Sequence, residues 1–397
     1  MKSIVIFPDY ADNVFFKNEL PYINSFFDEV YIISYHYNNS AHFNSNDHVF
    51  EIKIKYGNVF SLGFIKWFFG SDVRQEIRDH ISFSFMGLKR LARVIKYGVF
   101  LKEAKKIIKN RNIPLTSSTV IYSFWLTEGA YATAYLGDHF GLKTISRAHG
   151  FDLYEERNAR NYIPFRRAIA TKMSDIYFIS KDGKDYFEKK YSKYGIKSRL
   201  KISHLGTVDR GVLAYHDNGN KIIFASCSSV ISIKRIDLII RELSKLSFPF
   251  IWYHIGDGYL MKEIKIMAES YLPHGSYFLM GKIDNNKIVD FYKEHYVDYF
   301  INMSDHEGVP VSIMEAMSAG IPVIARDVGG TREIVNSSTG YLIKEKEDDE
   351  VVEKFLEIDF WDRDRYERMK AKARKKWATE YNADTNYNNF FKEISGK

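Results

Sequence analysis

Short apolar runs alternate with longer amphipathic stretches along most of the chain, and this alternation constrains the fold more than any other feature. In the first half the runs cover residues 3–7, 29–34, 119–123, 143–146 and 175–180. In the second half they cover residues 221–226, 250–255, 276–280, 299–302 and 322–325. Continuous apolar runs of this length are typical of parallel strands covered by helices on both faces. The pattern therefore predicts an α/β protein built from two doubly wound, Rossmann-like domains.

The length agrees with two domains, because 397 residues exceed what one hydrophobic core usually holds. A glycine-containing stretch at 206–211 marks the break between the two halves. We expect domains over 1–205 and 206–365, with C-terminal helices over 366–397 that cross back to the first domain. Ligands of such sheets bind beyond the carboxyl ends of the strands, so a cleft between facing domains is the expected site.

Composition excludes several classes of protein. The chain is 45% hydrophobic and 16% aromatic, too apolar for a disordered protein. A single cysteine, Cys227, rules out an intramolecular disulfide framework, and with no evident signal peptide it favours a reducing cytoplasm. No run of about 18 apolar residues is present, so no membrane span is expected. No zinc, helix-turn-helix or RNA-binding motif accompanies the net charge of +7, so nucleic acid is not an expected partner.

The positive charge is concentrated between residues 61 and 111. This stretch holds twelve Lys or Arg against four Asp or Glu, and aromatic residues interleave with them at 64–69. Its pattern is mostly helical from 75 to 110. Two interpretations stay open: the stretch rests on an anionic membrane surface, or it forms ordinary solvated amphipathic helices.

The chemistry is concentrated in the stretch 304–325, which reads as strand, loop, helix and strand. Pro310 fits the first helical position and Gly320 the position just past the helix end. The helix would begin beside Glu307 and Gly308, where free N–H groups and the helix dipole attract anions. Glu315 lies one to two turns into the helix. Two carboxylates beside a phosphate site are poor phosphate ligands but good acceptors for sugar hydroxyl groups.

The frame EGVPVSIMEAMSAGIPVIARDVGGTREIV, over residues 307–335, resembles the signature of glycosyltransferase family 4. Residues 147–152, 204–209, 234–237, 254–258 and 280–282 resemble further loops of that family. The resemblance implies the GT-B fold and retaining, metal-independent transfer from a nucleotide-sugar donor. It also implies that the first domain binds the acceptor and the second binds the nucleotide sugar.

The resemblance assigns roles residue by residue. Lys234 would neutralise the donor diphosphate, Glu307 would bind the donor sugar, and Glu315 would bind the ribose hydroxyls. His149 would contact the donor sugar or orient the leaving group, whereas Asp152 is expected to cap a helix. The expected catalytic residues are His149, Glu307 and Lys234. The expected donor-binding residues are Lys234, Arg235, Gly281, Lys282, Glu307, Gly308, Val309, Val311 and Glu315. No metal or other cofactor is expected.

The sequence departs from the family at two places. Pro8, Asp9 and Tyr10 follow the first strand where the family often has glycines, in a loop that usually meets the acceptor or the donor phosphate. Ser228 and Ser229 stand where the family often has an arginine before the diphosphate lysine. Arg235 is a candidate substitute for that arginine.

These observations predict a retaining glycosyltransferase acting in surface-polysaccharide assembly. Its expected partners are a nucleotide-sugar donor and a glycan or lipid-linked glycan acceptor, and an anionic membrane surface joins them under the first of the two interpretations of the stretch 61–111. The expected location is the cytoplasm, and under the membrane interpretation it is the inner face of the plasma membrane. One alternative is a GT-B nucleotide-sugar epimerase or hydrolase, which would need no acceptor. The other is a non-catalytic nucleotide-sugar-binding protein, against which the presence of Lys234, Glu307 and Glu315 argues.

Overall fold

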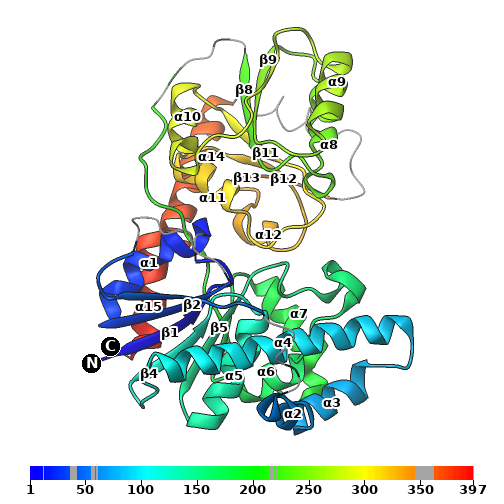
Figure 1. Ribbon diagram of the computed structural model, residues 1–397. Helices are drawn as coiled ribbons and strands as arrows, with labels where there is room; N and C mark the ends of the chain where they lie inside the picture. Colours follow the sequence, from blue (N-terminus) through cyan, green and yellow to red (C-terminus); the bar gives the residue numbers. More distant parts are fainter. Residues whose placement is uncertain are drawn as a thin grey trace. The chain divides into compact units, whose positions relative to one another are not determined.

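The computed structural model describes residues 1–11, 13–35, 43–54, 59, 61–214, 216, 219, 221–344 and 362–396. The chain divides into two compact units. The first comprises Met1–Ser203 together with Tyr387–Lys397, and the second comprises His204–Asn386. The α/β class and the two Rossmann-like units predicted from the sequence are confirmed (Figure 1). The functions expected of the two domains stay predictions.

The first unit is built on a parallel sheet whose strands follow the order β3-β2-β1-β4-β5-β6-β7 among the described residues. The strands are β1 Ser3–Phe7, β2 Glu29–Ser34, β3 Asp47–Glu51, β4 Thr119–Ser123, β5 Lys143–Ala148, β6 Asp175–Phe178 and β7 Arg199–Ile202. Strand β1 is buried throughout, as its sequence SIVIF requires. The direction of strand order reverses between β1 and β4, and such a switch point leaves a crevice for ligands.

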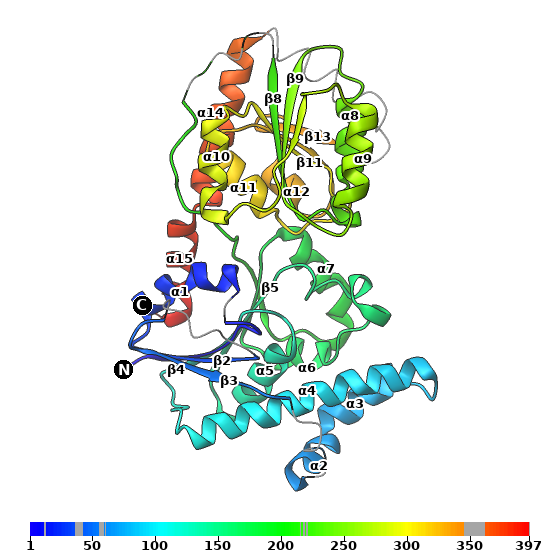
Figure 2. The same cartoon turned by 45° about the horizontal axis from the view of Figure 1, so that its top comes forward.

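Helices cover both faces of this sheet (Figure 2). The helices of this unit are α1 Val14–Phe26, α2 Leu62–Phe68, α3 Ser71–His80, α4 Phe85–Asn110, α5 Glu128–Phe140, α6 Arg166–Lys172, α7 Lys181–Tyr191 and α15 Ala383–Ser395, of which α2 and α3 pack on α4. Helix α4 spans 26 residues, and its buried residues join those of α5 and the strands in one core. The helices expected in the basic stretch are confirmed as α3 and α4.

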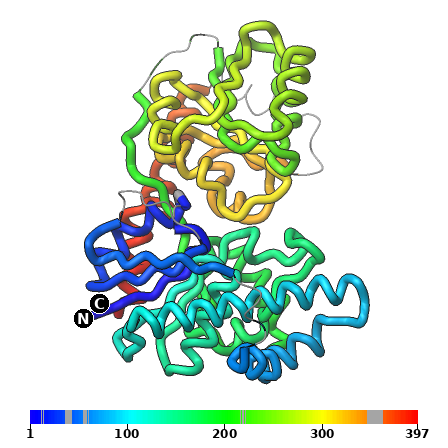
Figure 3. Tube along the Cα trace, viewed as in Figure 1, coloured from blue at the N-terminus to red at the C-terminus, as the bar shows by residue number. Residues whose placement is uncertain are grey.

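The last helix, α15, returns to the first unit and lies near β1 (Figure 3). Its aromatic residue Phe390 packs against Tyr122 of β4 and Tyr177 of β6. The guanidinium of Arg147 lies 4.0 Å from the Phe390 ring centroid. Arg147 also forms a fully buried ion pair with Glu19 of α1. A buried charge is tolerated only when it is paired, so this contact fixes α1, β5 and α15 together.

The second unit holds a parallel sheet with the order β10-β9-β8-β11-β12-β13 among the described residues. The strands are β8 Ile222–Cys227, β9 Phe250–Ile255, β10 Tyr277–Leu279, β11 Tyr299–Asn302, β12 Val323–Arg326 and β13 Gly340–Ile343. The switch point lies between β8 and β11. The loops that leave these two strands therefore flank the expected ligand crevice.

Helices α8 and α9 lie on one face of this sheet, and α10, α11 and α14 lie on the other (Figures 1 and 2). The helices are α8 Ile236–Leu243, α9 Met261–Tyr271, α10 Ile288–Glu294, α11 Val311–Ser318, α12 Thr331–Ile334 and α14 Arg363–Glu380. Helix α14 belongs to this unit, where Arg374 donates to the carbonyl of Ser318 at the end of α11. The chain crosses to the first unit only within α15.

Every strand predicted from an apolar run is present, with ends shifted by at most a few residues. Three observed strands, β3, β7 and β13, were not predicted. Strands β3 (DHVFE) and β7 (RLKI) are edge strands with half-buried or exposed side chains, so polar residues interrupt the apolar pattern. Strand β13 (GYLI) is short and opens with a glycine.

Candidate donor and acceptor sites

Lys234 and Glu307 come together at the switch point of the second unit. Lys234 ends a 3-10 turn after β8, and Glu307 lies in the loop after β11. The amide of Asp305 donates to the carbonyl of Ile233 at 2.9 Å, which ties the two loops together. Lys234 Nζ lies 2.7 Å from Glu307 Oε1. The structure thus joins two residues that the sequence analysis assigned separately to the diphosphate and to the sugar.

This ion pair is largely shielded from water. The Lys234 side chain is 25% exposed and the Glu307 side chain 10% exposed. Asn302, the last residue of β11, also donates to Glu307 Oε1 at 3.4 Å. Partial burial strengthens the attraction and makes it costly to leave either charge alone. A ligand that replaces this pairing must therefore offer an anion to Lys234 and hydrogen-bond donors to Glu307.

The loop after Glu307 presents backbone N–H groups at the start of α11. In the described part of the chain, the amides of Gly308, Val309 and Val311 donate to no protein acceptor. Pro310 is the N-cap, and its carbonyl accepts from Ile313 and Met314, both at 3.2 Å. The sequence placed Pro310 at the first helical position, so the helix begins one residue later than predicted. Free amides at a helix N-terminus favour an anion.

Gly329 and Gly330 pack closely against the backbone of the Glu307–Gly308 loop. A Cβ atom at Gly329 would lie 2.2 Å from the carbonyl oxygen of Glu307, and Gly329 has φ +50°. A Cβ atom at Gly330 would lie 2.2 Å from the carbonyl oxygen of Gly308. Only glycine allows backbone to pack this closely on backbone. The two glycines therefore help to set the conformation of the Glu307–Gly308 loop.

Arg235 is engaged by two aspartates. Its Nε and Nη2 each lie 3.0 Å from a carboxylate oxygen of Asp237, and its Nη1 lies 3.1 Å from Asp305 Oδ1. Arg326 donates to the same oxygen of Asp305. Arg235 also has φ +49°, an uncommon conformation for a residue with a side chain. These contacts assign Arg235 a part in holding the loop, and its expected donor contact stays a prediction.

Glu315 lies on α11 beside the carboxyl end of β8. Burial raises the pKa of its carboxyl to about 8, and Arg210 opposes this shift. The thiol of Cys227 lies close enough that the charge of Glu315 contributes to raising the pKa of that thiol. Among the described residues, no hydrogen bond to the Glu315 carboxylate is found. A buried carboxyl in this state is suited to accept hydrogen bonds from hydroxyl groups of a ligand.

Gly281 and Lys282 lie in the loop after β10. Gly281 has φ +68°, and its carbonyl accepts from the amide of Gly256 at 2.8 Å. A Cβ atom at Gly256 would lie 1.8 Å from the carbonyl of Ser228, one of the serines that replace the expected arginine. Lys282 is exposed. The loops after β8, β9 and β10 are thus in direct contact, and the contact of Gly281 and Lys282 with a donor stays a prediction.

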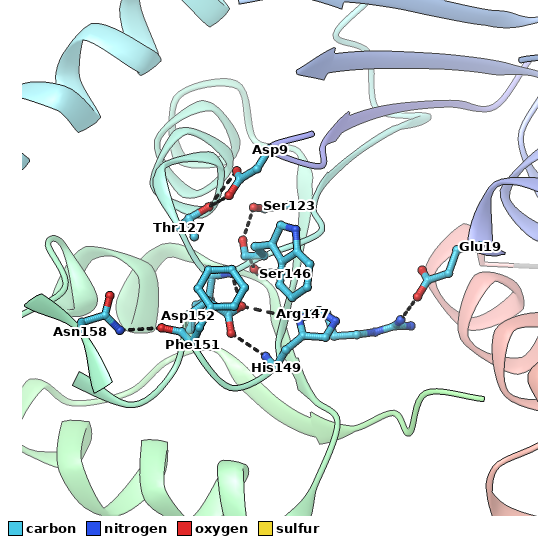
Figure 4. Close-up of polar contacts among 12 residues, drawn as sticks. Asp9, Glu19, Ser123, Thr127, Ser146, Arg147, His149, Phe151, Asp152 and Asn158 are labelled. Atoms are coloured by element: carbon cyan, nitrogen blue, oxygen red, sulfur yellow. Dashed lines mark hydrogen bonds and ion pairs between the residues drawn. The ribbon is translucent and has the colours of Figure 1, made fainter. Parts of the chain in front are cut away.

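The first unit carries its own polar cluster around His149, directly after β5 (Figure 4). His149 is 6% exposed, and its imidazole packs against the rings of Trp125 and Phe124, at 4.1 and 5.3 Å between centroids. Its Nδ1 lies 3.6 Å from Asp152 Oδ2. Neither ring nitrogen has a hydrogen-bond partner among the described protein atoms. Burial lowers the pKa of His149 although Asp152 opposes the shift, so the neutral imidazole is favoured.

Asp152 does not cap a helix, and that prediction is wrong. Its carboxylate accepts from the amides of His149 at 2.9 Å and of Leu126 at 2.8 Å. These two bonds join the loop after β5 to the loop after β4. Hydrogen bonds and the proximity of His149 lower the pKa of Asp152 despite its burial. Asp152 therefore orients the His149 loop as a fixed negative charge.

Asp9 is a feature of this cluster that the sequence analysis left without a role. It follows β1 at the switch point, and both its carboxylate oxygens accept from the hydroxyl of Thr127 at 3.0 Å (Figure 4). Its φ of +59° is the left-handed conformation that a glycine would adopt freely. Burial and the nearby Glu128 raise the pKa of Asp9 to about 7. Strained, titratable residues at a switch point are typical of ligand sites.

Comparisons with known proteins agree with this geometry. Residues 214–376 match the family model described as glycosyl transferases group 1. The O-antigen biosynthesis glycosyltransferase WbnH of Escherichia coli is 27% identical over 321 residues, covering 78% of this chain and 85% of that protein. An uncharacterized glycosyltransferase of Methanocaldococcus jannaschii is 26% identical over 276 residues, covering 69% of this chain and 72% of that protein. The chain is a glycosyltransferase.

Solved structures agree on the fold of the glycosyltransferase. HepE of Anabaena, in complex with UDP, matches with a TM-score of 0.70 at 13% identity over 100% of both chains. A likeness at this identity shows the GT-B fold and nothing finer. The enzymatic identity removes the non-catalytic binding protein from the alternatives.

Part of the site in this glycosyltransferase was accessible to sequence analysis and part was not. Lys234, Glu307 and Gly308 belong to a motif, and the structure brings them to one switch point. Asn302, which also contacts Glu307, has no motif of its own. Asp9 was noticed only as a departure from glycine. A polar residue in the loop after the first buried strand is the signal that points to it.

Proposed function

We propose that the glycosyltransferase is a retaining enzyme of family 4 that transfers a sugar from a nucleoside-diphosphate donor to a glycan or lipid-linked glycan acceptor. The observation that carries this proposal is the Lys234–Glu307 ion pair beside the open amides of Gly308, Val309 and Val311. WbnH is named for O-antigen biosynthesis, and this name supports a role in surface-polysaccharide assembly. HepE is solved with UDP and with UDP-glucose, which supports a nucleotide-sugar donor.

In this proposal the donor rearranges the ion pair. The diphosphate binds Lys234 and the free amides, because a dianion competes well for a cation already paired with one carboxylate. Glu307 then accepts hydrogen bonds from hydroxyls of the donor sugar. Glu315 accepts hydrogen bonds from the ribose hydroxyls. In this proposal one cation, Lys234, binds the anionic diphosphate, and two carboxylates, Glu307 and Glu315, bind hydroxyl groups.

Transfer with retention needs no protein nucleophile in this proposal. The acceptor hydroxyl attacks the anomeric carbon on the face that the diphosphate leaves. The bond between the anomeric carbon and the phosphate oxygen breaks, and a diphosphate oxygen takes the hydroxyl proton. Lys234 and the amides stabilise the negative charge that develops on the leaving group, which is the main contribution of the protein. The contact of His149 with the donor sugar remains part of the proposal.

Product analysis tests this function. A panel of nucleotide sugars is first screened by thermal shift, since a bound ligand raises the apparent stability. The stabilising donor is then incubated with and without a glycan acceptor. The proposal expects sugar transfer with the donor's anomeric configuration kept, and little turnover without acceptor. Rapid acceptor-independent release of sugar or of an epimer would favour the epimerase or hydrolase. An inverted product would contradict retention.

We also propose that the stretch 61–111 contacts an anionic membrane surface, at the inner face of the plasma membrane. No helix in the described part of the chain is long and apolar enough to cross a bilayer. Large apolar side chains are exposed on this stretch, at Leu62, Ile65, Phe69, Phe83, Phe85, Met86 and Leu88. Basic residues interleave with them, and each contributes about 1 kcal/mol near an anionic surface. Sedimentation with vesicles should show binding that rises with anionic lipid and falls with salt, and equal binding to neutral vesicles would contradict it.

A further inference from the structure

The turn between α3 and α4 carries a group of exposed apolar side chains. Phe83 is fully exposed, and the exposed fractions of Phe85, Met86 and Leu88 are 73%, 49% and 66%. In Figures 1 and 2 this turn projects from the rest of the first unit. Single exposed apolar residues are ordinary, whereas several large ones gathered at one projecting point indicate an interaction surface.

The turn is held in one conformation by Gly87 and two serines. Gly87 is buried, and a Cβ atom there would lie 1.8 Å from the carbonyl oxygen of Ser82. Ser84 caps α4, because its side-chain oxygen accepts from the amide of Gly87 at 3.1 Å. The amide of Ser84 donates to the carbonyl of Ser82 at 2.8 Å, and the two hydroxyl oxygens lie 2.9 Å apart. A defined turn therefore displays the apolar group, so little ordering is needed when a partner covers it.

Basic side chains border this apolar group. Residues 80–95 include Lys89, Arg90 and Arg93 and contain no Asp or Glu. Lys89 Nζ lies 3.8 Å from the centroid of the Phe85 ring. Arg90 and Arg93 donate to backbone carbonyl oxygens, which orient the guanidinium groups without neutralising their charge. The start of α4 thus combines exposed apolar side chains with a surrounding positive charge.

This combination favours a lipid bilayer over a second copy of the chain. Asp79, the acid just before the turn, lies 3.6 Å from Arg167, so it adds little negative charge to the surface. In a symmetric dimer through this turn, basic residues would face basic residues, which is unfavourable. A bilayer with anionic lipids offers negative headgroups to the basic residues and an apolar layer beneath them. A projecting turn can enter that layer without a preformed groove.

We propose that the α3–α4 turn inserts into an anionic bilayer, with Phe83 and Phe85 entering below the headgroup phosphates and Lys89 staying at their level. The inference rests on the membrane contact proposed above for the stretch 61–111 and names the segment that enters the bilayer. Charge attraction alone would leave the protein adsorbed on the headgroups. Apolar groups of interfacial segments penetrate by about 5–10 Å, which is the depth expected for the two rings.

A fluorescent label at the turn measures insertion directly. Phe83→Cys, in the full chain with Cys227→Ala, is labelled with an NBD dye and mixed with vesicles of phosphatidylglycerol and phosphatidylcholine. On binding, its emission should shift to shorter wavelength. Nitroxides near the carboxyl end of the acyl chains should quench it, and iodide in the water should not. A bound protein whose label stays accessible to iodide would overturn insertion.

The control label is placed on α1, outside the basic stretch. Phe15 is 39% exposed, so Phe15→Cys in the same Cys227→Ala chain accepts the dye in the same way. Its emission should not shift on binding, and iodide should still quench it. Equal shifts at both positions would mean that the dye itself enters the lipid, which would overturn the assignment to the turn. Melting temperatures check that both labelled proteins fold.

Two uncharged double variants measure what the turn contributes to binding. Phe83→Ser with Phe85→Ser removes two exposed rings and keeps every charge, so the fold should be unaffected. Partitioning onto the same vesicles should weaken by about tenfold or more, because less apolar area enters the bilayer. Phe15→Ser with Ile202→Ser changes two exposed apolar residues elsewhere in the first unit and should alter partitioning by less than about twofold. Equal losses in the two variants would overturn the inference.

The outcomes separate insertion from the membrane contact on which it rests. If the unchanged chain does not bind anionic vesicles, both proposals fail. If it binds and Phe83→Ser with Phe85→Ser binds equally well, charge attraction stands and insertion fails. Sedimentation velocity without lipid tests the remaining occupant. Dimers of the unchanged chain that this double variant dissociates would mean that a second copy covers the turn, and would overturn insertion.

Discussion

Lys234 and Glu307 lie 73 positions apart in the sequence and form an ion pair of 2.7 Å between Nζ and Oε1 at the switch point of the second unit. The ion pair holds a cation and a carboxylate in place at the switch point of the free enzyme. Each compensates the charge of the other in the free enzyme. Removing one partner therefore has two effects. The contact of that side chain with a ligand is lost, and the charge of the other side chain is left largely buried and unpaired.

Lys234→Ala should lower kcat/KM for the donor by about 30-fold or more, since losing one partner of a shielded charge contact costs about 2–5 kcal/mol. Steady-state kinetics measures this, with circular dichroism as the check on folding. Lys262→Ala, on α9 of the same unit, is the matched control and should leave kcat/KM unchanged. Near-normal kcat/KM in Lys234→Ala would move the diphosphate contact to another residue.

Donor turnover should persist in excess chelator. In the described part of the chain, no group of three or more His, Cys, Asp or Glu side chains is arranged to hold a metal ion. In the proposed function, Lys234 supplies the positive charge that a diphosphate needs. Activity is measured with and without EDTA after removal of added metals. A loss of more than about tenfold that magnesium or manganese restores would contradict metal-free donor binding.

Binding of the nucleoside diphosphate should release a proton from Glu315. Its pKa of about 8 means that the carboxyl is mostly protonated at pH 7 in the free enzyme. Ribose hydroxyls donate to the ionised form and therefore lower this pKa on binding. Calorimetry at pH 7 in buffers of different ionisation enthalpy counts the released protons. Glu315→Gln should remove most of the release, and an equal release in both proteins would assign the proton to another group.

Asp9 should make the folded state less stable as the pH rises. Its folded pKa of about 7 lies above the ordinary aspartate pKa of 3.8, so between these pH values the folded state binds the proton more tightly. The contribution of Asp9 to stability is complete below pH 3.8 and is lost as the pH rises through about 7. Asp9→Asn should therefore flatten the fall in melting temperature between pH 5 and 8.

The matched control for Asp9 is Asp185→Asn, on the exposed face of α7, where the carboxylate pairs with Lys181. Surface pairs contribute little, so this variant should follow the pH dependence of the unchanged chain. Glu19 and Glu76 also have raised pKa values, so the flattening by Asp9→Asn should be partial. If Asp9→Asn and Asp185→Asn have the same pH profile, the carboxyl of Asp9 is not held in its protonated form.

The sequence predicted those parts of the molecule whose structure or role depends on one local sequence pattern. Buried strands such as β1 and β11 are continuous apolar runs, and Glu307 and Gly308 belong to one contiguous motif. Edge strands were not predicted, because their half-exposed positions tolerate polar residues that interrupt the apolar pattern, as in β3. The contacts of Arg235 with Asp237 and Asp305 were also inaccessible, because the direction of a side chain depends on loops brought together by the fold.

In the proposed mechanism, Glu307 recognises the transferring sugar and Glu315 recognises the nucleotide. The two glutamine variants should therefore fail differently. Glu307→Gln should lower kcat by about 100-fold or more, because it removes a contact that strengthens in the transition state. Glu315→Gln should chiefly raise the KM for the donor, because a ribose contact is made equally in the ground state and the transition state.

The most direct measurement is calorimetric titration of the nucleoside diphosphate product into the unchanged chain and both variants. The product carries the ribose and the diphosphate but no sugar, so it reports the two carboxylates separately. We predict that Glu315→Gln weakens product binding by about tenfold or more, whereas Glu307→Gln changes it by less than about threefold. Loss of product binding in Glu307→Gln with normal binding in Glu315→Gln would contradict the account and reverse the two roles.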